Sequence, residues 1–313
     1  MKFKKPKFWD YKKPSINSYL LWPISILIKL ISLFKMIITK KRSTSIKTIC
    51  IGNIYLGGTG KTSLSLKINK ILNERKIKNC FIKKFYSNQI DEQNLLENSG
   101  KLFKNKNRLN SLLQANSEGY EVAIFDDGLQ DNSIDYDLRI VCFNNTNWIG
   151  NGFTIPSGPL RENIENIKKY KNVFLNGNDE DLDEIKKFIS KIDTNINIYQ
   201  GKYIPKNIEE FNTNDKFLVF SGIGNHKTFI SMLKNNKLNI IKDIEFPDHY
   251  SYSKNDINEI ISISNELDCR IITTEKDYIR LKKNDLSKIK YIKVDLEILN
   301  EKKFLNDISE LYE

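Results

Sequence analysis

The sequence predicts an α/β fold in which helices cover mostly parallel sheets. From residue 46 onward, short runs rich in β-branched and aromatic residues alternate with longer helical patterns, and this alternation is typical of α/β layers. The chain has 313 residues, of which 40% are hydrophobic and 11% aromatic. It is therefore long enough to form two domains with hydrophobic cores.

The basic charge of the chain is concentrated at the N-terminus. Residues 1–47 hold twelve basic side chains and one acidic one, which leaves 38 of the 50 basic and 38 of the 39 acidic residues for the rest. The net charge of +11 therefore belongs to this segment. The neutral remainder disfavours nucleic acid as a partner, because phosphate contacts need a basic stripe on the folded surface.

Residues 1–45 are predicted to associate with a membrane. Ser18 to Arg42 is the most apolar run of the chain, and Ser25, Lys29 and Ser32 recur in it as a narrow polar stripe at helical spacing. Two lysines within the run count against a spanning helix, which needs about 20 apolar residues with few charges. We expect an amphipathic helix in the membrane interface, with the flanking lysines over anionic head groups. The alternative is a helix that packs on the protein's own core.

The body of the chain is predicted to form two domains. The Gly- and Pro-containing loop 149–166 is the predicted hinge, so that residues 46–165 form the first domain and residues 166–313 the second. The predicted strands are Lys47–Gly52, Asn79–Lys83, Glu121–Phe125, Leu138–Phe143, Asn172–Leu175, Phe217–Phe220, Leu238–Glu245, Arg270–Thr273 and Tyr291–Asp295. The predicted helices of the body are Lys61–Arg75, Arg108–Glu118, Lys227–Asn235 and Lys254–Leu267.

A glycine-rich stretch, IGNIYLGGTGKTS at Ile51 to Ser63, predicts a phosphate-binding loop. It follows a β-branched strand and precedes a helical pattern, so backbone N–H groups and the helix N-terminus can cradle an anion. The general pattern G-x-x-x-x-G-K-[ST] wants glycine where this chain has Tyr55, and a purely structural glycine turn is the alternative. In a nucleotide loop, Lys61 would contact the β- and γ-phosphates and Thr62 would contact Mg²⁺. The candidate nucleotide-binding residues are Tyr55, Leu56, Gly57, Gly58, Thr59, Gly60, Lys61 and Thr62.

Two adjacent carboxylates, Asp126 and Asp127, end the predicted strand in EVAIFDDGLQ. Carboxylates at the C-terminal end of a strand are suited to holding Mg²⁺ or its water shell. Asp-Gly is also common in plain turns, but after a phosphate loop we expect these residues, with Thr62, on the metal side of the site.

The chain contains only two histidines, His226 and His249. His249 follows Asp248 in a polar loop between a predicted strand and a predicted helix, which suits a side chain that relays or orients a proton. An ordinary surface histidine is the alternative.

Six motifs in this order resemble the tetraacyldisaccharide 4'-kinase family over nearly the whole chain. The PSGPLRE run and the FPDH loop are far more specific than the phosphate loop. The matching stretches are GNIYLGGTGKT (Gly52–Thr62), DDGLQ (Asp126–Gln130), GNGFTIPSGPLRE (Gly150–Glu162), FSGIGNHKTF (Phe220–Phe229), FPDHY (Phe246–Tyr250) and TTEKD (Thr273–Asp277).

The resemblance implies a P-loop NTPase-type three-layer α/β/α domain with a smaller α/β domain closing over the site. It implies ATP and Mg²⁺ as cofactors and a lipid disaccharide 1-phosphate as the acceptor, at the cytoplasmic face of the inner membrane. The protein would be peripheral there, on an anionic membrane surface, and we expect a monomer. The family's catalytic dyad maps onto Asp91, as the base, and His249, while Glu92, Arg108 and Arg161 are candidate substrate contacts.

The chain departs from the family pattern in two places. The family's S-R-G-Y stretch corresponds to a shortened run, KKFYSNQIDE at Lys83 to Glu92, that lacks the arginine and the glycine. The histidine that follows the D-D-G-[FL]-Q motif in the family is Asp131 here. Both departures concern the substrate side of the site.

A different class of protein is the alternative, namely the membrane-associated switch ATPases with a deviant K-G-G-x-G-K-[ST] loop. Their signature lysine would fall at Leu56. Such a switch hydrolyses ATP without an acceptor and has no need of His249 for handling a proton.

Overall fold

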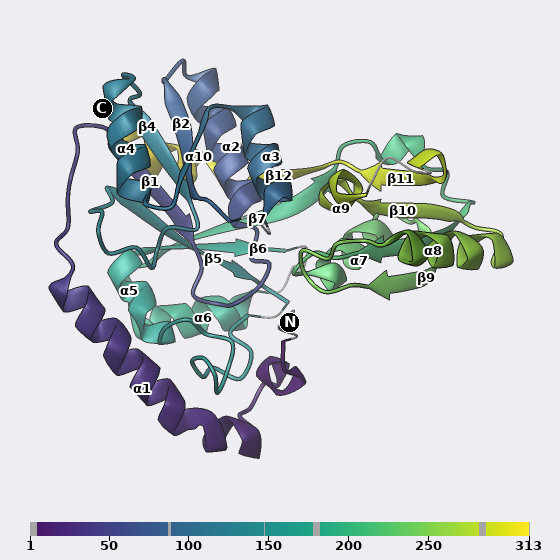
Figure 1. The fold of residues 1–313 in the computed structure, drawn as a ribbon, viewed down its shortest axis with the longest axis horizontal. Helices are drawn as coiled ribbons and strands as arrows, with labels where there is room; N and C mark the ends of the chain where they lie inside the picture. Colours follow the sequence, from purple (N-terminus) through teal and green to yellow (C-terminus); the bar gives the residue numbers. More distant parts are fainter. Residues whose placement is uncertain (1–4, 87–88, 147, 178–181, 282–285, 313) are drawn as a thin grey trace.

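The computed structural model describes residues 5–86, 89–146, 148–177, 182–281 and 286–312, and it contains two sheets (Figure 1). The larger sheet has eight strands in the order β12-β7-β6-β5-β1-β4-β2-β3, and only β12 runs antiparallel to its neighbour. These strands are β1 (Lys47–Gly52), β2 (Asn79–Lys84), β3 (Leu102–Asn105), β4 (Val122–Asp126), β5 (Leu138–Asn144), β6 (Asn172–Asn176), β7 (Asn197–Pro205) and β12 (Val294–Leu299).

Helices cover both faces of this sheet, as the predicted three-layer fold requires. The central strands are buried on both sides: burial is continuous over β4 and over all of β1 except Lys47, and does not alternate. One face packs against α2 (Lys61–Glu74), α3 (Ile90–Ser99) and α10 (Glu301–Ser309). The other packs against α4 (Arg108–Ser117), α5 (Ile167–Tyr170) and α6 (Asp183–Ile192).

The smaller sheet has four parallel strands in the order β11-β10-β8-β9. One face packs against α7 and the other against α8 and α9. The bounds are β8 (Lys216–Ser221), α7 (His226–Asn235), β9 (Asn239–Glu245), α8 (Lys254–Glu266), β10 (Arg270–Thr274), α9 (Glu275–Arg280) and β11 (Ile289–Ile292). Short 3₁₀ turns lie at η1 (Lys7–Asp10), η2 (Ile164–Asn166), η3 (Ile208–Glu210) and η4 (Leu286–Lys288).

The division between the sheets differs from the predicted boundary at residue 166. β6, β7 and β12 follow that residue in sequence, yet they belong to the larger sheet. The chain instead passes to the smaller sheet after Pro205 and returns before Val294, and the two crossings lie side by side, with Lys206 N donating to Lys293 O at 2.8 Å. The loop 149–166 joins β5 to α5 within one domain, so its glycines and prolines do not mark the connection between the sheets.

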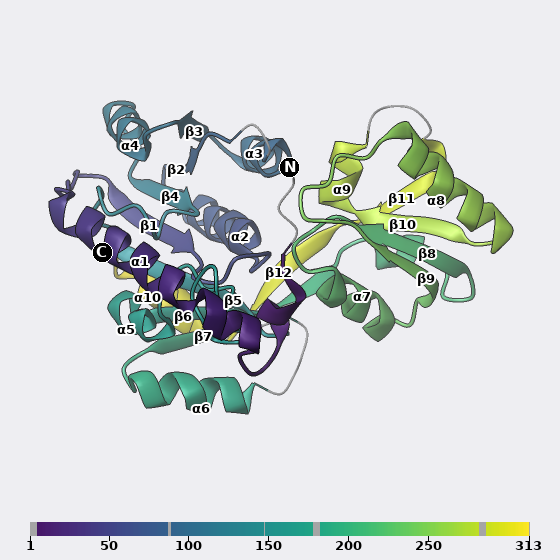
Figure 2. The ribbon, with the colours of Figure 1, turned by 60° about the horizontal axis from the view of Figure 1, so that its bottom comes forward.

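The N-terminal helix α1 (Ile16–Ile38) lies along the outside of the larger domain (Figure 2). An 18-residue window of it has a mean hydropathy of 1.9 and is only 6% buried, so by length and composition the helix could cross a membrane. Ser18 and Ser25 face the protein, and Ser25 Oγ donates to Thr154 O at 2.9 Å. Of the predicted polar stripe, Ser25 is buried while Lys29 and Ser32 are exposed. The contact with the protein therefore includes polar bonds of Ser18 and Ser25 and the edge contact of Tyr19 with Phe153, while most of the large apolar side chains are exposed.

Candidate active site

The predicted phosphate loop joins β1 to the first residue of α2, Lys61. Gly60 precedes the helix with φ +79°, and a side chain there would collide with the Tyr203 hydroxyl and the Asn176 amide. Asn176 Nδ2 also donates to Thr59 O at 2.6 Å. The loop thus requires glycine at residue 60 both for its left-handed backbone and for the closeness of β6 and β7.

The first residues of the loop, Tyr55 and Leu56, are held by the N-terminal segment and by the loop 149–166. Leu56 N donates to Pro159 O at 2.8 Å, and the buried Tyr55 hydroxyl donates to Asp10 Oδ1 at 3.0 Å. The Tyr55 side chain therefore supports the loop and is not among the residues that line the neighbouring cavity. Tyrosine takes the place of the usual glycine because its side chain is a packing element here.

Asp126 ends β4 directly beneath the start of α2 and is fully buried. Its Oδ2 accepts a hydrogen bond from Thr62 Oγ1 at 3.2 Å, and its Oδ1 accepts from Ser65 Oγ at 3.4 Å. A hydroxyl and a carboxylate in contact at the end of a phosphate loop are the oxygen ligands that Mg²⁺ takes together with nucleotide phosphates. Among the described residues, no group of three or more His, Cys, Asp or Glu side chains could hold a metal, so a metal here would also need oxygens from phosphate or water.

Asp127 turns away from Asp126 with a left-handed backbone of φ +64°. Its carboxylate lies 3.9 Å from Lys61 Nζ and 3.0 Å from Arg161 Nη1, while Arg108 donates to its carbonyl oxygen. Burial alone would raise the pKa of Asp127, but the charges of Lys61 and Arg161 outweigh it, and the pKa is lowered. Two of the predicted substrate residues, Arg108 and Arg161, thus bind Asp127 and stabilise the turn at Asp126 and Asp127, called the acidic turn below.

A buried lysine that the sequence did not single out connects the acidic turn to α3. Lys83 Nζ lies 2.5 Å from Asp126 Oδ2 and 2.7 Å from Glu92 Oε2, and the Lys83 side chain is only 2% exposed. The other oxygen of Glu92 lies 3.3 Å from Lys276 Nζ, which comes from α9 of the smaller domain. Burial would raise the pKa of Glu92, but Lys276, Lys83 and Lys61 hold it well below its ordinary value.

Asp91 and His249 come from different domains and meet between them. Asp91 lies in the first turn of α3, His249 lies in the loop between β9 and α8 with φ +54°, and His249 Nδ1 is 3.3 Å from Asp91 Oδ1. Arg280 of α9 donates from Nε to the other oxygen, Oδ2, at 3.2 Å, and its Nη2 lies within ion-pair distance of the same oxygen at 3.1 Å. Both oxygens of this carboxylate are therefore oriented by side chains of the smaller domain.

This arrangement shifts the pKa of both members of the pair. Burial would raise the pKa of Asp91, but the hydrogen bond with His249 and the charge of Arg280 lower it below 3.8. Burial would lower the pKa of His249, but the hydrogen bond to Asp91 and the charge of Asp248 raise it above 6.5. The pair therefore favours an ionised aspartate beside a protonated imidazole.

A cavity of about 200 Å³ lies between the phosphate loop and the smaller domain. Gly58 packs so closely on Gly224 that a Cβ at residue 58 would lie 2.9 Å from the Gly224 backbone. Asn225 follows, and its buried Nδ2 has no hydrogen-bond partner among the described residues, so it is free to donate to a ligand. The lining includes Gly60, Thr62, Asn225, His249, Lys276 and Arg280.

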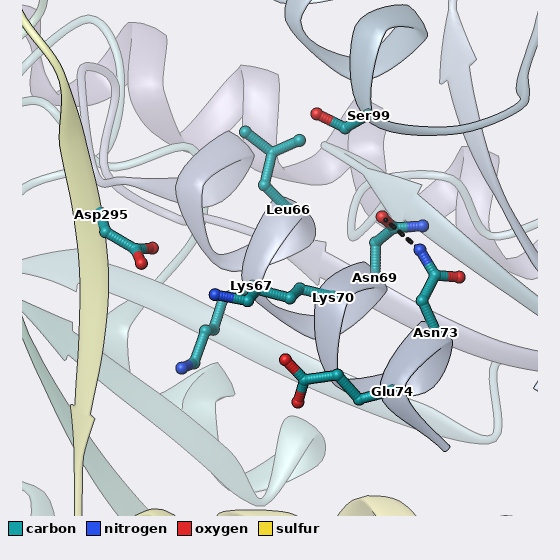
Figure 3. A pocket seen from close by; sticks show the side chains of 8 residues that line it. All are labelled: Leu66, Lys67, Asn69, Lys70, Asn73, Glu74, Ser99 and Asp295. Carbon is teal, nitrogen blue, oxygen red and sulfur yellow. Dashed lines mark hydrogen bonds between the residues drawn. The ribbon is translucent and has the colours of Figure 1, made fainter. Parts of the chain in front are cut away.

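A second hollow of about 550 Å³ lies along the later turns of α2, away from the phosphate loop (Figure 3). Its lining is polar and charged, with Asn73 donating to Asn69 at 3.2 Å. Lys67 at its edge is paired with Glu301 at 2.9 Å. None of the predicted site residues lines this hollow. The predicted site residues that do line a cavity lie in the smaller one between the domains.

Comparison with known proteins agrees with this arrangement. The family model described as tetraacyldisaccharide-1-P 4'-kinase matches residues 17–105 and 91–313. The tetraacyldisaccharide 4'-kinase of Pelagibacter ubique (strain HTCC1062) is 60% identical over 313 residues, which cover 100% of this chain and 99% of that protein. The chain belongs to the tetraacyldisaccharide 4'-kinase family. The enzyme of the same name from Rickettsia conorii is 32% identical, over 96% of this chain and 97% of that protein.

A solved structure supports the fold of this tetraacyldisaccharide 4'-kinase family member. LpxK from Aquifex aeolicus, solved in complex with ATP, matches with a TM-score of 0.69 over 95% of this chain and 99% of that chain. The sequence identity is 21%. The predicted three-layer domain with a smaller α/β domain is confirmed.

Three charged side chains of the tetraacyldisaccharide 4'-kinase site were not singled out by the motifs. Lys276 lies within the TTEKD stretch, and its place in that motif was the available signal; Arg280 lies one helical turn later, outside the motif. Lys83 carried a weaker signal, namely a lysine at the end of an otherwise apolar strand. Lysine is so abundant in this chain that a single one carries little information.

Proposed function

We propose that the protein transfers the γ-phosphate of ATP to the 4'-hydroxyl of an acylated glucosamine disaccharide 1-phosphate. The observation that carries this proposal is the Asp91–His249 pair, whose histidine lines the same cavity as Gly60 and Thr62 of the phosphate loop. An aspartate beside an imidazole near the phosphate end of a nucleotide site suits deprotonation of an acceptor hydroxyl. Membership of the family supports the identity of the acceptor.

Asp91 accepts the proton of the acceptor hydroxyl in this proposal. A sugar hydroxyl is a weak nucleophile at neutral pH, and a positioned base contributes about 10² to 10⁴ in rate. His249 orients Asp91 through Oδ1 and relays the proton, while Arg280 fixes Oδ2. Because the hydrogen bond with His249 and the charge of Arg280 outweigh the effect of burial and keep Asp91 ionised, the base is available throughout the neutral pH range.

The loop residues Gly57 to Thr62 bind the ATP phosphates, with Lys61 on the β- and γ-phosphates. Thr62 and Asp126 hold Mg²⁺, and their contact at 3.2 Å supports this assignment. When bound, Mg²⁺ supplies positive charge that neutralises the transferring phosphoryl group. Asp127 keeps the turn in place through Lys61 and Arg161 and belongs to the outer part of the metal site.

The helix α1 binds the membrane and so brings the protein to its lipid acceptor. The apolar side of this helix is exposed, with Leu27 and Leu30 both 57% and Phe34 65% accessible. Such a surface suits insertion among acyl chains, and the flanking lysines suit anionic head groups. We assign the protein to the cytoplasmic face of the inner membrane as a peripheral protein.

Incubation with MgATP in mixed micelles, with and without the lipid disaccharide 1-phosphate, tests the proposal. The expected result is ADP formation that depends on the lipid, with the phosphate recovered on the 4'-oxygen. ATP turnover that is indifferent to the lipid would refute the kinase and favour a switch ATPase. A variant with Lys61→Met, which removes the phosphate-binding ammonium, is the control for contaminating activity.

A further inference from the structure

Lys83 lies between the buried carboxylate of Asp126 and the partly buried carboxylate of Glu92. It is the last residue but one of β2, and its ammonium bridges Asp126 Oδ2 at 2.5 Å and Glu92 Oε2 at 2.7 Å. The same Asp126 oxygen accepts the hydrogen bond of Thr62. The lysine thus shares an oxygen atom with the proposed Mg²⁺ site.

The chemistry of this bridge resembles that of a bound cation. The carboxylates of Asp126 and Glu92 both contact one ammonium, and carboxylate oxygens are the ligands that Mg²⁺ and Mn²⁺ prefer. Removing the ammonium would leave the buried negative charge of Asp126 unpaired beside the partly buried one of Glu92, an arrangement that favours capture of another cation. Lys276 neutralises only the far oxygen of Glu92.

We propose that Lys83 is a specificity-determining residue that keeps free divalent cations out of the Asp126–Glu92 pair. The metal then binds only together with ATP, whose triphosphate supplies the negative charge that the ammonium has cancelled. This inference rests on the proposed ATP and Mg²⁺ site. Lys83 would thus determine that the metal binds with ATP and not before it, and Lys83 would take no part in proton transfer.

Binding of Mn²⁺ to the nucleotide-free protein, followed by electron paramagnetic resonance, tests the inference. We expect Lys83→Met to bind Mn²⁺ at least tenfold more tightly than the wild type when no nucleotide is present. With a non-hydrolysable ATP analogue added, both proteins should bind Mn²⁺. The double variant Lys83→Met, Glu92→Gln should lose the gain, because the second carboxylate is gone.

Lys84→Met is the matched control. Lys84 is the next residue of the same strand, its ammonium lies 5.7 Å from the Tyr86 ring centroid, and it is only partly buried. This variant should bind Mn²⁺ as the wild type does.

If Lys83→Met is too unstable for the binding experiment, its thermal unfolding with and without Mn²⁺ tests the same inference. Mn²⁺ alone should then raise the melting temperature of Lys83→Met and leave that of the wild type unchanged. Equal nucleotide-free Mn²⁺ affinity in the wild type and Lys83→Met would overturn this inference alone. A wild type that fails to bind Mn²⁺ even with the ATP analogue would overturn both it and the proposed cofactor site.

Discussion

Single residues of this protein are fixed by partners from a distant part of the chain. Asp91 is oriented by His249 and Arg280, more than 150 residues later. Asp126 is oriented by Thr62, Ser65 and Lys83. The reactive geometry is therefore a property of the closed arrangement of two domains, because neither domain contains both members of the Asp91–His249 pair.

The stability of the protein should depend on pH through His249. Its pKa is raised above 6.5 in the folded protein, so the stabilisation that it provides is fully present below the unfolded value. This stabilisation is lost as the pH rises through the raised value. We expect the difference in the free energy of unfolding between the wild type and His249→Gln to be larger at pH 6 than at pH 9.

Denaturant titration at several pH values measures this difference. The direction of this pH dependence also follows from Asp91, the partner of His249. The pKa of Asp91 is lowered, so its carboxylate remains ionised over the whole range. A pH-independent difference between the two proteins would show that the imidazole is not protonated beside Asp91. His226 is the other histidine, and a His226→Gln variant shows how much of any pH dependence comes from elsewhere.

At the scale of elements, the sequence predicted most of the central strands but not their pairing. The alternation of apolar runs located β1, β2, β4, β5 and β6 to within about two residues. The strand β3 is only four residues long and β7 contains polar residues throughout, so neither gave a clear pattern. The predicted strand Tyr291–Asp295 proved to be the end of β11 and the start of β12, which lie in different sheets.

The motifs located the phosphate loop and the acidic turn because each is continuous in sequence. They located Asp91 by resemblance, but the helix α3 that carries it was not predicted. The bridging role of Lys83 could not be predicted, since it depends on two carboxylates from α3 and β4. Contacts of this kind are set by packing between elements, for which sequence periodicity has no signal.

The outward face of α1 should decide membrane binding. Replacing Leu27, Leu30 and Phe34 by glutamine removes three exposed apolar side chains, each worth about 1.5 to 3 kcal/mol when fully buried. We expect the triple variant to lose binding to anionic liposomes by on the order of 100-fold or more. Liposome sedimentation measures this loss.

The control variant for liposome binding carries a substitution on the side of α1 that faces the protein. Ser25→Ala alters the face that contacts Thr154 and leaves the apolar side intact, so it should bind liposomes as the wild type does. If the triple glutamine variant bound liposomes as well as the wild type, α1 would not be the membrane anchor, and the prediction of a helix in the membrane interface would be wrong.

At the scale of the whole molecule, two domains close on one cavity from opposite sides. The larger domain supplies the phosphate loop, the acidic turn and Asp91, while the smaller domain supplies His249, Lys276 and Arg280. The close packing of Gly58 on Gly224 brings the domains together at the phosphate loop itself. The same contact between the domains therefore brings the residues of the candidate site together.

The most direct test of this account is a double-mutant cycle across the domain boundary. Asp91→Asn and His249→Gln are each expected to lower kcat/KM for the lipid acceptor by about 10² to 10⁴ at saturating MgATP, with ATP affinity unchanged. If the two side chains act as one unit, the double variant will be no slower than the more damaging single variant. Effects that multiply in the double variant would contradict the shared role of Asp91 and His249.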